Sequence, residues 1–144
     1  MQVSNLLANK NQEVATISQE RTVSDALILL KERGIGALVV TGPTPPLVGI
    51  FSERDAVRAL ATNGAKALDT KVAELMSTDV QTCDETTTVT ELMGLMTGRR
   101  IRHLPVVHEG QLVGMISIGD LVKWIITSQQ QTIEQLHSYI SGSA

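Results

Sequence analysis

Aromatic side chains are almost absent from this chain of 144 residues, in which Phe, Trp and Tyr occur once each and together make up 2%. Hydrophobic residues nevertheless account for 42% and charged residues for 19%, a composition typical of globular proteins. The core must therefore be filled by aliphatic side chains, which suits a parallel sheet packed against helices. This length allows one ordinary domain, so the copies of any internal duplication must share a core.

Cysteine is also scarce, and a strong net charge and long apolar runs are absent. Cys83 is the only cysteine, which excludes an internal disulfide. The formal net charge of -3 argues against a general affinity for nucleic acid or acidic membranes. No apolar run approaches the roughly 18 residues of a membrane span, and the residues after Met1 lack the basic and apolar regions of a signal peptide. We therefore expect a cytoplasmic protein with no membrane association.

The sequence repeats once. Residues 22–25 (TVSD) recur as 88–91 (TVTE), 34–40 (GIGALVV) align with 100–106 (RIRHLPV), and 47–55 (LVGIFSERD) align with 112–120 (LVGMISIGD). The loop before the last block is one residue longer in the first copy, as loops tolerate. A single duplication with so long a period predicts two lobes related by a pseudo-twofold axis.

Each copy is predicted to fold in the order β-α-β-β-α. A short strand (15–17; 80–82) precedes a helix whose apolar residues recur at i, i+3, i+4 and i+7. Thr22 or a neighbour opens the first of these helices and Gly34 ends it. Buried strands follow at 37–40 and 104–107, and a turn leads to strands at 47–51 and 112–116 and then to a second helix.

The chain ends in a predicted amphipathic helix. Ile133, Leu136 and Ile140 follow the run 124–126 (WII) at a spacing that places them on one helical face. This stripe either covers the core or seals a dimer. The expected units are residues 1–68 for the first repeat with its N-terminal segment, 69–125 for the second repeat, and 126–144 for the C-terminal helix and a frayed tail.

Residues 49–55 (GIFSERD) and 114–120 (GMISIGD), each after a strand-turn hairpin, resemble the signature of the cystathionine β-synthase (CBS) domain. Residues 102–107 (RHLPVV) resemble the second-strand motif of the same family. The resemblance covers about residues 1–125 and is closest to small stand-alone tandem-CBS proteins, which carry no catalytic domain.

This resemblance implies an α/β fold in which two β-α-β-β-α CBS repeats pack about a pseudo-twofold axis, an arrangement called a Bateman module, with a cleft on each side. Family members bind adenosine derivatives in these clefts: AMP, ADP, ATP, S-adenosylmethionine or NAD(H). Many of them form homodimers.

Two Ser-x-x-Asp motifs carry the candidate binding chemistry. Ser52 and Ser117 are expected at helix N-termini, where free backbone N–H groups can hold a phosphate. Asp55 and Asp120 can each accept two hydrogen bonds, which suits the 2′ and 3′ hydroxyls of a ribose, the role that the resemblance implies for them. The alternative is a capping box, in which the acid only caps the backbone.

The resemblance also implies that each cleft draws on both repeats. One predicted site combines Ser117, Asp120 and Met115 with Thr16, Gly36 and Ala37, and its mate combines Ser52, Asp55 and Ile50 with Thr82, Arg102 and His103. Because Gly36-Ala37 aligns with Arg102-His103, the two sites are expected to bind differently. Arg102 matches a family position that often contacts phosphate, and a guanidinium binds phosphate oxygens bidentately.

Other polar residues leave alternatives open. Arg99 and Arg100 assist Arg102 or, as we prefer, are solvated charges at a helix end. Arg54, between Ser52 and Asp55, reaches a phosphate or has only a surface role. His103 contacts ligand or is a polar residue at a sheet end. No cluster of His, Cys and Asp at metal-ligand spacing is present, so no metal site is expected.

These features predict a regulatory module that binds an adenine nucleotide, AMP first, and signals to an unidentified protein partner. The alternative is a non-catalytic interaction or dimerisation module with empty clefts. Catalysis is not expected, because nothing resembles a catalytic barrel or a Gly-x-Gly-x-x-Gly loop after a strand, and Cys83 has no base in a recognisable motif.

Overall fold

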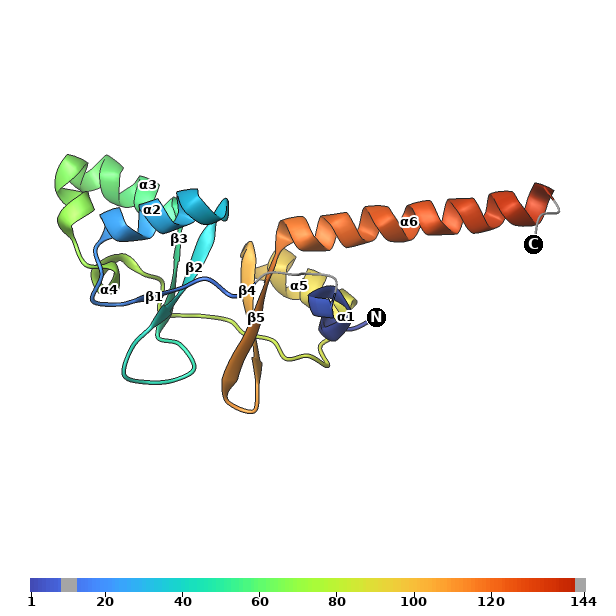
Figure 1. The fold of residues 1–144 in the computed structure, drawn as a ribbon, viewed down its shortest axis with the longest axis horizontal. Helices are drawn as coiled ribbons and strands as arrows, with labels where there is room; N and C mark the ends of the chain where they lie inside the picture. Colours follow the sequence, from blue (N-terminus) through green and yellow to red (C-terminus); the bar gives the residue numbers. More distant parts are fainter. Residues whose placement is uncertain (9–12, 142–144) are drawn as a thin grey trace.

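The computed structural model describes residues 1–8 and 13–141 and shows two α/β lobes side by side, with a long C-terminal helix leaving the body (Figure 1). The mixed α/β fold expected from the repeat is confirmed. In chain order the elements are α1 (Val3–Ala8), β1 (Thr16–Ser18), α2 (Val23–Arg33), β2 (Ala37–Thr41), β3 (Gly49–Ser52), α3 (Glu53–Asn63), the 3-10 helix η1 (Gly64–Asp69), α4 (Val72–Leu75), α5 (Val89–Arg99), β4 (His103–His108), β5 (Gln111–Ser117) and α6 (Ile118–Ser141).

Thr22 and Gly34 bound α2 as predicted. The Thr22 hydroxyl oxygen accepts a hydrogen bond from the Asp25 backbone N–H at 3.2 Å, as an N-cap does. Gly34 adopts the left-handed conformation (φ 62°, ψ 40°) that ends helices, and its N–H donates to the carbonyl of Leu30. Local sequence signals therefore determine both ends of this helix.

The strands form two small sheets. The first has the order β1-β2-β3, with β1 parallel to β2 and β2 antiparallel to β3. The second consists of β4 and β5, which pair antiparallel. The expectation of a parallel sheet is therefore wrong, since β1–β2 is the only parallel pair among the strands of the described residues.

The strand predicted at 80–82 is also absent, and proline explains why. In the first repeat the Val39 N–H donates to the Ala15 carbonyl at 3.1 Å. The residue aligned with Val39 is Pro105, which has no N–H to donate. Only Cys83 pairs with β4, through a parallel bridge to Val106. The second copy of the first strand is thus reduced to one residue.

Helix α6 is continuous over 24 residues, so no break separates the second repeat from the C-terminal helix at 125/126. Leu121 is buried, and Trp124 and Ile125 pack against the core of the second repeat. From Ile126 onward the helix is largely exposed and projects away from both lobes (Figure 1). The apolar stripe therefore covers the core at its start and is exposed further on. No helix in the described ranges combines the length and the hydropathy needed to cross a membrane.

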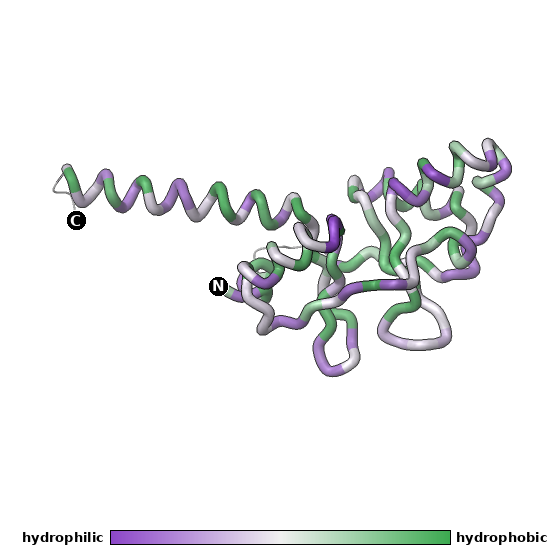
Figure 2. The backbone as a smooth tube through the Cα atoms, turned by 180° about the vertical axis from the view of Figure 1, so that it is seen from behind, coloured by the Kyte–Doolittle hydropathy of each residue, from purple (hydrophilic) through white to green (hydrophobic). Residues whose placement is uncertain are grey.

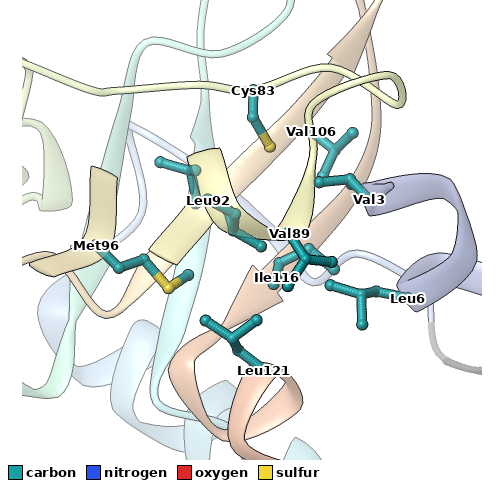
Figure 3. Close-up of a cluster of buried hydrophobic side chains, with 10 residues drawn as sticks. Val3, Leu6, Cys83, Val89, Leu92, Met96, Val106, Ile116 and Leu121 are labelled. Atoms are coloured by element: carbon teal, nitrogen blue, oxygen red, sulfur yellow. The ribbon is translucent and has the colours of Figure 1, made fainter. Parts of the chain in front are cut away.

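Each core is completed by a leading segment from the other repeat. Val3 and Leu6 of α1 lie in the buried cluster of the second repeat, beside Val89 and Ile116 (Figure 3). Reciprocally, Val72 of α4 lies in the buried cluster of the first repeat. Backbone bridges between Gln2 and Thr88 and between Thr22 and Lys71 accompany these two crossings. The two repeats are therefore interlocked and share one folding unit.

A third cluster joins the two sheets. Ala37 and Val39 of β2 pack with Met115 of β5, and the half-buried Ile50 and Leu112 lie against them. Because these side chains come from both sheets, the sheets meet across this cluster. The ends of the strands that carry the Ser-x-x-Asp motifs are thereby held next to the opposite repeat.

Candidate ligand-binding clefts

Two clefts lie between the repeats. Cleft 1 has a volume of about 280 Å³ and is lined by residues of both repeats: Glu13, Val14, Ala15, Gly34, Ile35, Gly36, Ala37, His103, Met115, Ser117 and Asp120. It therefore brings together five of the six residues predicted for the first site. A cavity of this size is close to the lower end of the range typical of small-molecule sites.

Cleft 2 has a volume of about 310 Å³. It is lined by Gly36, Ile50, Ser52, Glu53, Arg54, Asp55, Arg58, Ser77, Asp79, Val80, Gln81, Arg100, Ile101, Arg102 and His103. Five of the six residues predicted for the second site are among them, together with Arg54. Both clefts thus combine a Ser-x-x-Asp helix start from one repeat with a strand start from the other.

Thr16 and Thr82 line neither cleft. The first-strand segments enter the clefts through the residues just before them, Glu13–Ala15 in cleft 1 and Asp79–Gln81 in cleft 2. These two triplets occupy the same place in the repeat. Thr16 instead lines a separate hollow with Arg21 and Asp25, and Thr82 is exposed.

Both Ser-x-x-Asp motifs form capping boxes. In cleft 2 the Ser52 N–H donates to Asp55 Oδ2 at 2.8 Å, and the Asp55 N–H donates to the Ser52 hydroxyl oxygen at 3.4 Å. In cleft 1 the corresponding distances between Ser117 and Asp120 are 2.8 and 3.1 Å. A carboxylate has about four acceptor positions, so capping leaves capacity for ligand hydroxyls.

A third capping box shows that the motif alone does not make a site. Thr22 and Asp25 form the same reciprocal pair at the start of α2, at 3.2 and 3.4 Å. This helix start lies outside both clefts. What distinguishes the boxes at Ser52 and Ser117 is that each opens into a cleft between the repeats.

The two clefts differ in charge. Cleft 2 is lined by the guanidinium groups of Arg54, Arg58, Arg100 and Arg102 and by the carboxylates of Glu53, Asp55 and Asp79. In cleft 1 the described lining residues that carry a full charge are Glu13 and Asp120, and none is a lysine or arginine. The sequence predicted such a difference from Arg102 alone. The sequence did not predict Glu53, Arg58 or Asp79 in this cleft, and for Arg100 it favoured a solvated charge over a role in binding.

His103 separates the two clefts and lines both. It begins β4, and its ring lies over Gly36 of the first repeat: a β-carbon on Gly36 would be 3.4 Å from His103 Cε1. The absence of a side chain at Gly36 thus lets the imidazole reach across between the repeats. His103 is therefore a shared wall, a position that the sequence did not predict.

Cys83 lies away from the clefts, in the buried cluster of the second repeat (Figure 3). Burial, and then the charge of Asp84, raise the pKa of its thiol to about 11. The group is thus a thiol at neutral pH and a poor nucleophile. Within the described ranges no three His, Cys, Asp or Glu side chains are grouped so as to hold a metal ion.

Known proteins resemble this chain over most of its length. The family described as CBS domain matches residues 3–62 and 72–127. The CBS domain-containing protein CBSX3, mitochondrial, of Arabidopsis thaliana is 37% identical over 125 residues, which are 84% of this chain and 61% of CBSX3. This chain therefore spans less than two thirds of that relative.

Two solved structures have the same fold. The CBS-domain containing protein ATU1752 of Agrobacterium tumefaciens is 42% identical, with a TM-score of 0.81 over 85% of this chain and 91% of its own. The CBS domain protein PAE2072 of Pyrobaculum aerophilum, complexed with AMP, is 28% identical, with a TM-score of 0.74 over 83% and 89%.

Proposed function

The chain belongs to the CBS domain family and carries two copies of the domain, and from this premise we propose that it is a non-catalytic regulatory module that senses adenosine-containing nucleotides. AMP is the first candidate ligand, ahead of ADP, ATP, NAD(H) and S-adenosylmethionine. Its proposed compartment is the cytoplasm, as the sequence predicts.

The observation that carries this proposal is the place of the two Ser-x-x-Asp helix starts, each in a cleft that is completed by the opposite repeat. In cleft 2 the positive end of the α3 helix dipole and the neighbouring arginines would favour a phosphate. Asp55 or Asp120 would accept hydrogen bonds from the ribose hydroxyls. The complex of PAE2072 with AMP supports an adenosine ligand for a module of this fold.

Sensing would follow from the shared walls of the clefts. A ligand in either cleft touches both repeats, and it therefore favours the relative arrangement of the repeats that it fits better. A partner protein that binds one arrangement more tightly would then respond to the ligand. The partner is unidentified, and the proposal requires only that it contacts both repeats or their dimer.

Conservative substitutions of the two aspartates test the proposal. Glutamate is the usual acid of a capping box, so Asp55→Glu and Asp120→Glu should preserve the helix caps while moving the carboxylate away from the ribose. Thermal unfolding is measured with AMP, ADP, ATP, NADH and S-adenosylmethionine at millimolar concentration. A ligand at about one hundred times its Kd should stabilise the native chain by about 2.7 kcal/mol, and the double variant should lose this stabilisation.

Absence of stabilisation by all five ligands would overturn the proposal. If ligands stabilise both the native chain and the double variant equally, the ribose role of the aspartates is wrong and the boxes are only caps. The variant's own melting temperature, close to that of the native chain, separates loss of binding from loss of structure.

The exposed part of α6 supports a second candidate function, a dimerisation module. Hydrophobic residues recur along the projecting helix (Figure 2). Ile126, Ile133 and Ile140 are seven residues apart and are exposed to 50%, 64% and 81%, and Leu136 is exposed to 57%. In heptad terms the isoleucines take position a and Leu136 takes position d, a choice that favours parallel pairs of helices.

We propose that a second copy of the chain covers this stripe. From Trp124 to Ser141 the only side chain with a full charge is Glu134, which takes heptad position b outside the seam, so no charged side chain lies between two such helices. A helix with no core contacts is marginally stable on its own, and burial of its apolar stripe would stabilise it. The homodimer is compatible with ligand sensing, and it is the whole function only if the clefts stay empty.

A further inference from the structure

Three arginines that line cleft 2 stand where the other repeat has glycine. Aligning the two copies pairs Arg100 with Gly34, Arg102 with Gly36, and Arg54 with Gly119. Gly34 and Gly36 line cleft 1, whereas Arg100 and Arg102 line cleft 2. At these two positions of the repeat, arginine therefore replaces glycine in the wall of cleft 2.

The backbone supports this pairing. The Glu53 N–H donates to the Gly36 carbonyl at 3.0 Å, and the Ile118 N–H donates to the Arg102 carbonyl at 2.8 Å. These bonds join the same two places of the repeat in both copies. The backbone at these positions is therefore alike in the two copies, and the clefts differ in their side chains.

Arg100 occupies a backbone conformation that disfavours it. Its φ of 54° and ψ of 38° are left-handed, close to the 62° and 40° of Gly34 at the end of the corresponding helix. Glycine adopts this conformation at little cost, whereas a side chain with a β-carbon is strained there. Strain of this kind clusters at functional sites. A structural helix end alone would favour glycine, so the arginine points to a role in cleft 2.

These exchanges account for three of the four arginines that line cleft 2. Four arginines and three carboxylates line cleft 2, and guanidinium groups bind phosphate oxygens through charge-assisted hydrogen bonds. The carboxylates of Glu13 and Asp120 line cleft 1, with no lysine or arginine among its described lining residues. A phosphate in cleft 1 would therefore lie near negative charge with no such partner.

We propose that the two clefts sort adenosine ligands by charge. Cleft 2 takes phosphorylated nucleotides. Its arginines reverse the order of AMP and ATP given above for the module as a whole, so that affinity in this cleft rises from AMP to ATP. Cleft 1 takes an adenosine compound whose 5′ substituent is neutral or cationic. This inference rests on the proposed function, because both clefts must first bind the ribose through Asp55 and Asp120.

Titration calorimetry of single-cleft variants tests the sorting. Asp120→Glu leaves cleft 2 as the competent site, and Asp55→Glu leaves cleft 1; each is titrated with adenosine, AMP, ADP and ATP without magnesium. In Asp120→Glu the affinity should rise by about tenfold or more from adenosine to ATP, since hydrogen bonds between charged groups are among the stronger ones. It should fall as salt is raised. In Asp55→Glu adenosine should bind more tightly than ATP.

Arg100→Gly provides the sharper test, because it removes the charge and also relieves the left-handed strain. In the Asp120→Glu background it should weaken ATP binding by about tenfold while the melting temperature stays equal or rises. Arg99→Ala is the matched control: it removes the same charge from the neighbouring residue, which does not line cleft 2, and it should leave ATP binding unchanged.

Equal preference for ATP over adenosine in the two clefts would overturn the sorting and leave the proposed function standing. Unchanged ATP binding in Arg100→Gly would overturn the role of that arginine in the same way. If none of the four ligands binds the native chain, the sorting is wrong, and the proposed function is wrong as well if NADH and S-adenosylmethionine also fail to bind.

Discussion

Gly114 of β5 lies directly against Leu7 of α1, because a β-carbon at Gly114 would stand 2.5 Å from Leu7 Cδ2. The same relationship recurs in the first repeat, where a β-carbon at Gly49 would stand 2.7 Å from Met76 Sδ. Leu7 lies in α1, and Met76 directly follows α4. Both helices pack on the core of the opposite repeat. The glycine that both copies share at this place thus makes room for the interlocking segment.

Gly114→Ala should therefore destabilise the fold. Adding a methyl group to this packed contact forces Leu7 or the strand to move, at a cost of about 1 to 3 kcal/mol. Chemical unfolding in urea measures the change. Trimming the partner in Leu7→Ala/Gly114→Ala should recover part of the loss relative to the sum of the single variants, because the two sites are in contact.

Gly94→Ala is the control for a change of glycine to alanine as such. Gly94 lies in α5 and a β-carbon there meets nothing within 4 Å. Alanine should stabilise the helix by about 0.5 to 1 kcal/mol. Destabilisation of similar size at both positions would contradict the crossing contact as the cause.

The packing of α1 and α4 on the opposite repeats could not be predicted from the sequence, although the sequence shows that the two segments are alike. The likeness of Val3, Leu6 and Leu7 to Val72, Leu75 and Met76 shows that the leading segments repeat. It does not show on which core each segment packs. That choice depends on contacts between residues far apart in the chain, which periodicity does not encode. Most of the order of strands and helices, by contrast, follows from local patterns and was predicted; the exceptions are the strand expected at 80–82, which is absent, and the short helices α1, η1 and α4, which were not predicted.

The differences within the repeat have local physical causes. Pro105 removes the N–H that holds the first strand in the other copy, so Val80–Thr82 does not pair even though its sequence suits a strand. Which residues of the first-strand segment line a cleft depends on the exact position of that segment along the neighbouring strand. A shift of a few residues replaces Thr16 by Glu13–Ala15 among the lining residues, and such shifts are the weakest part of prediction from sequence.

Arg100 shows what a one-dimensional interpretation misses. A basic residue in the last turn of a helix is explained by the helix dipole, so its charge pointed to solvent. The left-handed cap and the cleft that it lines become visible only with the second repeat in place. The repeat in the sequence already aligns Arg100 with Gly34. Only the structure shows that both residues adopt a left-handed conformation, which glycine accepts readily and arginine does not.

Thr22→Ala should separate capping from binding. Removing this N-cap hydroxyl should cost about 1 kcal/mol of stability, because the Asp25 N–H loses its partner. Ligand affinity should not change, since α2 begins outside both clefts. Ser52→Ala should cost a similar amount of stability and in addition weaken nucleotide binding. Urea unfolding and calorimetry on the two variants check both halves of the comparison.

Equal effects of Thr22→Ala and Ser52→Ala on ligand affinity would contradict the special role of the clefts. The comparison is matched, because in both boxes the hydroxyl accepts from the N–H of the acid three residues on, at 3.2 Å for Thr22 and 3.4 Å for Ser52. Besides their surroundings, the boxes differ in that the Ser52 hydroxyl also donates to Asp55 Oδ2 at 3.2 Å.

Cys83 should make the fold less stable at alkaline pH. Burial raises the pKa of its thiol to about 11 in the native state, above the ordinary value of 9.0. Between these values the unfolded chain loses the proton while the native chain keeps it, so stability is complete below pH 9 and falls as pH rises toward 11. A shift of about two pH units corresponds to about 2 to 3 kcal/mol.

Urea unfolding of the native chain and of Cys83→Ala at pH 8 and pH 10.5 checks this. Alanine cannot ionise, so the variant should lose less stability across this interval, whatever its stability at pH 8. Equal slopes in the two proteins would show that other groups cause the alkaline loss.

Ile133→Glu should prevent dimerisation through α6. A carboxylate at position a of the heptad would be buried without a partner between two helices, so the chain should become monomeric at concentrations where the native chain is a dimer. Light scattering coupled to size exclusion measures the mass. Because Ile133 lies 64% exposed on the part of α6 that projects from the body, the melting of the two lobes should change little apart from the loss of dimer contacts.

Gln131→Glu adds the same charge two residues away, at heptad position f, which faces outward in a pair of helices. It should leave the dimer intact. Dissociation by both substitutions would indicate a general charge effect, and a dimer that survives Ile133→Glu would show that another surface joins the copies. Nucleotide binding measured on the monomeric variant then decides whether the clefts need the dimer, because their described lining residues all lie outside the projecting part of α6.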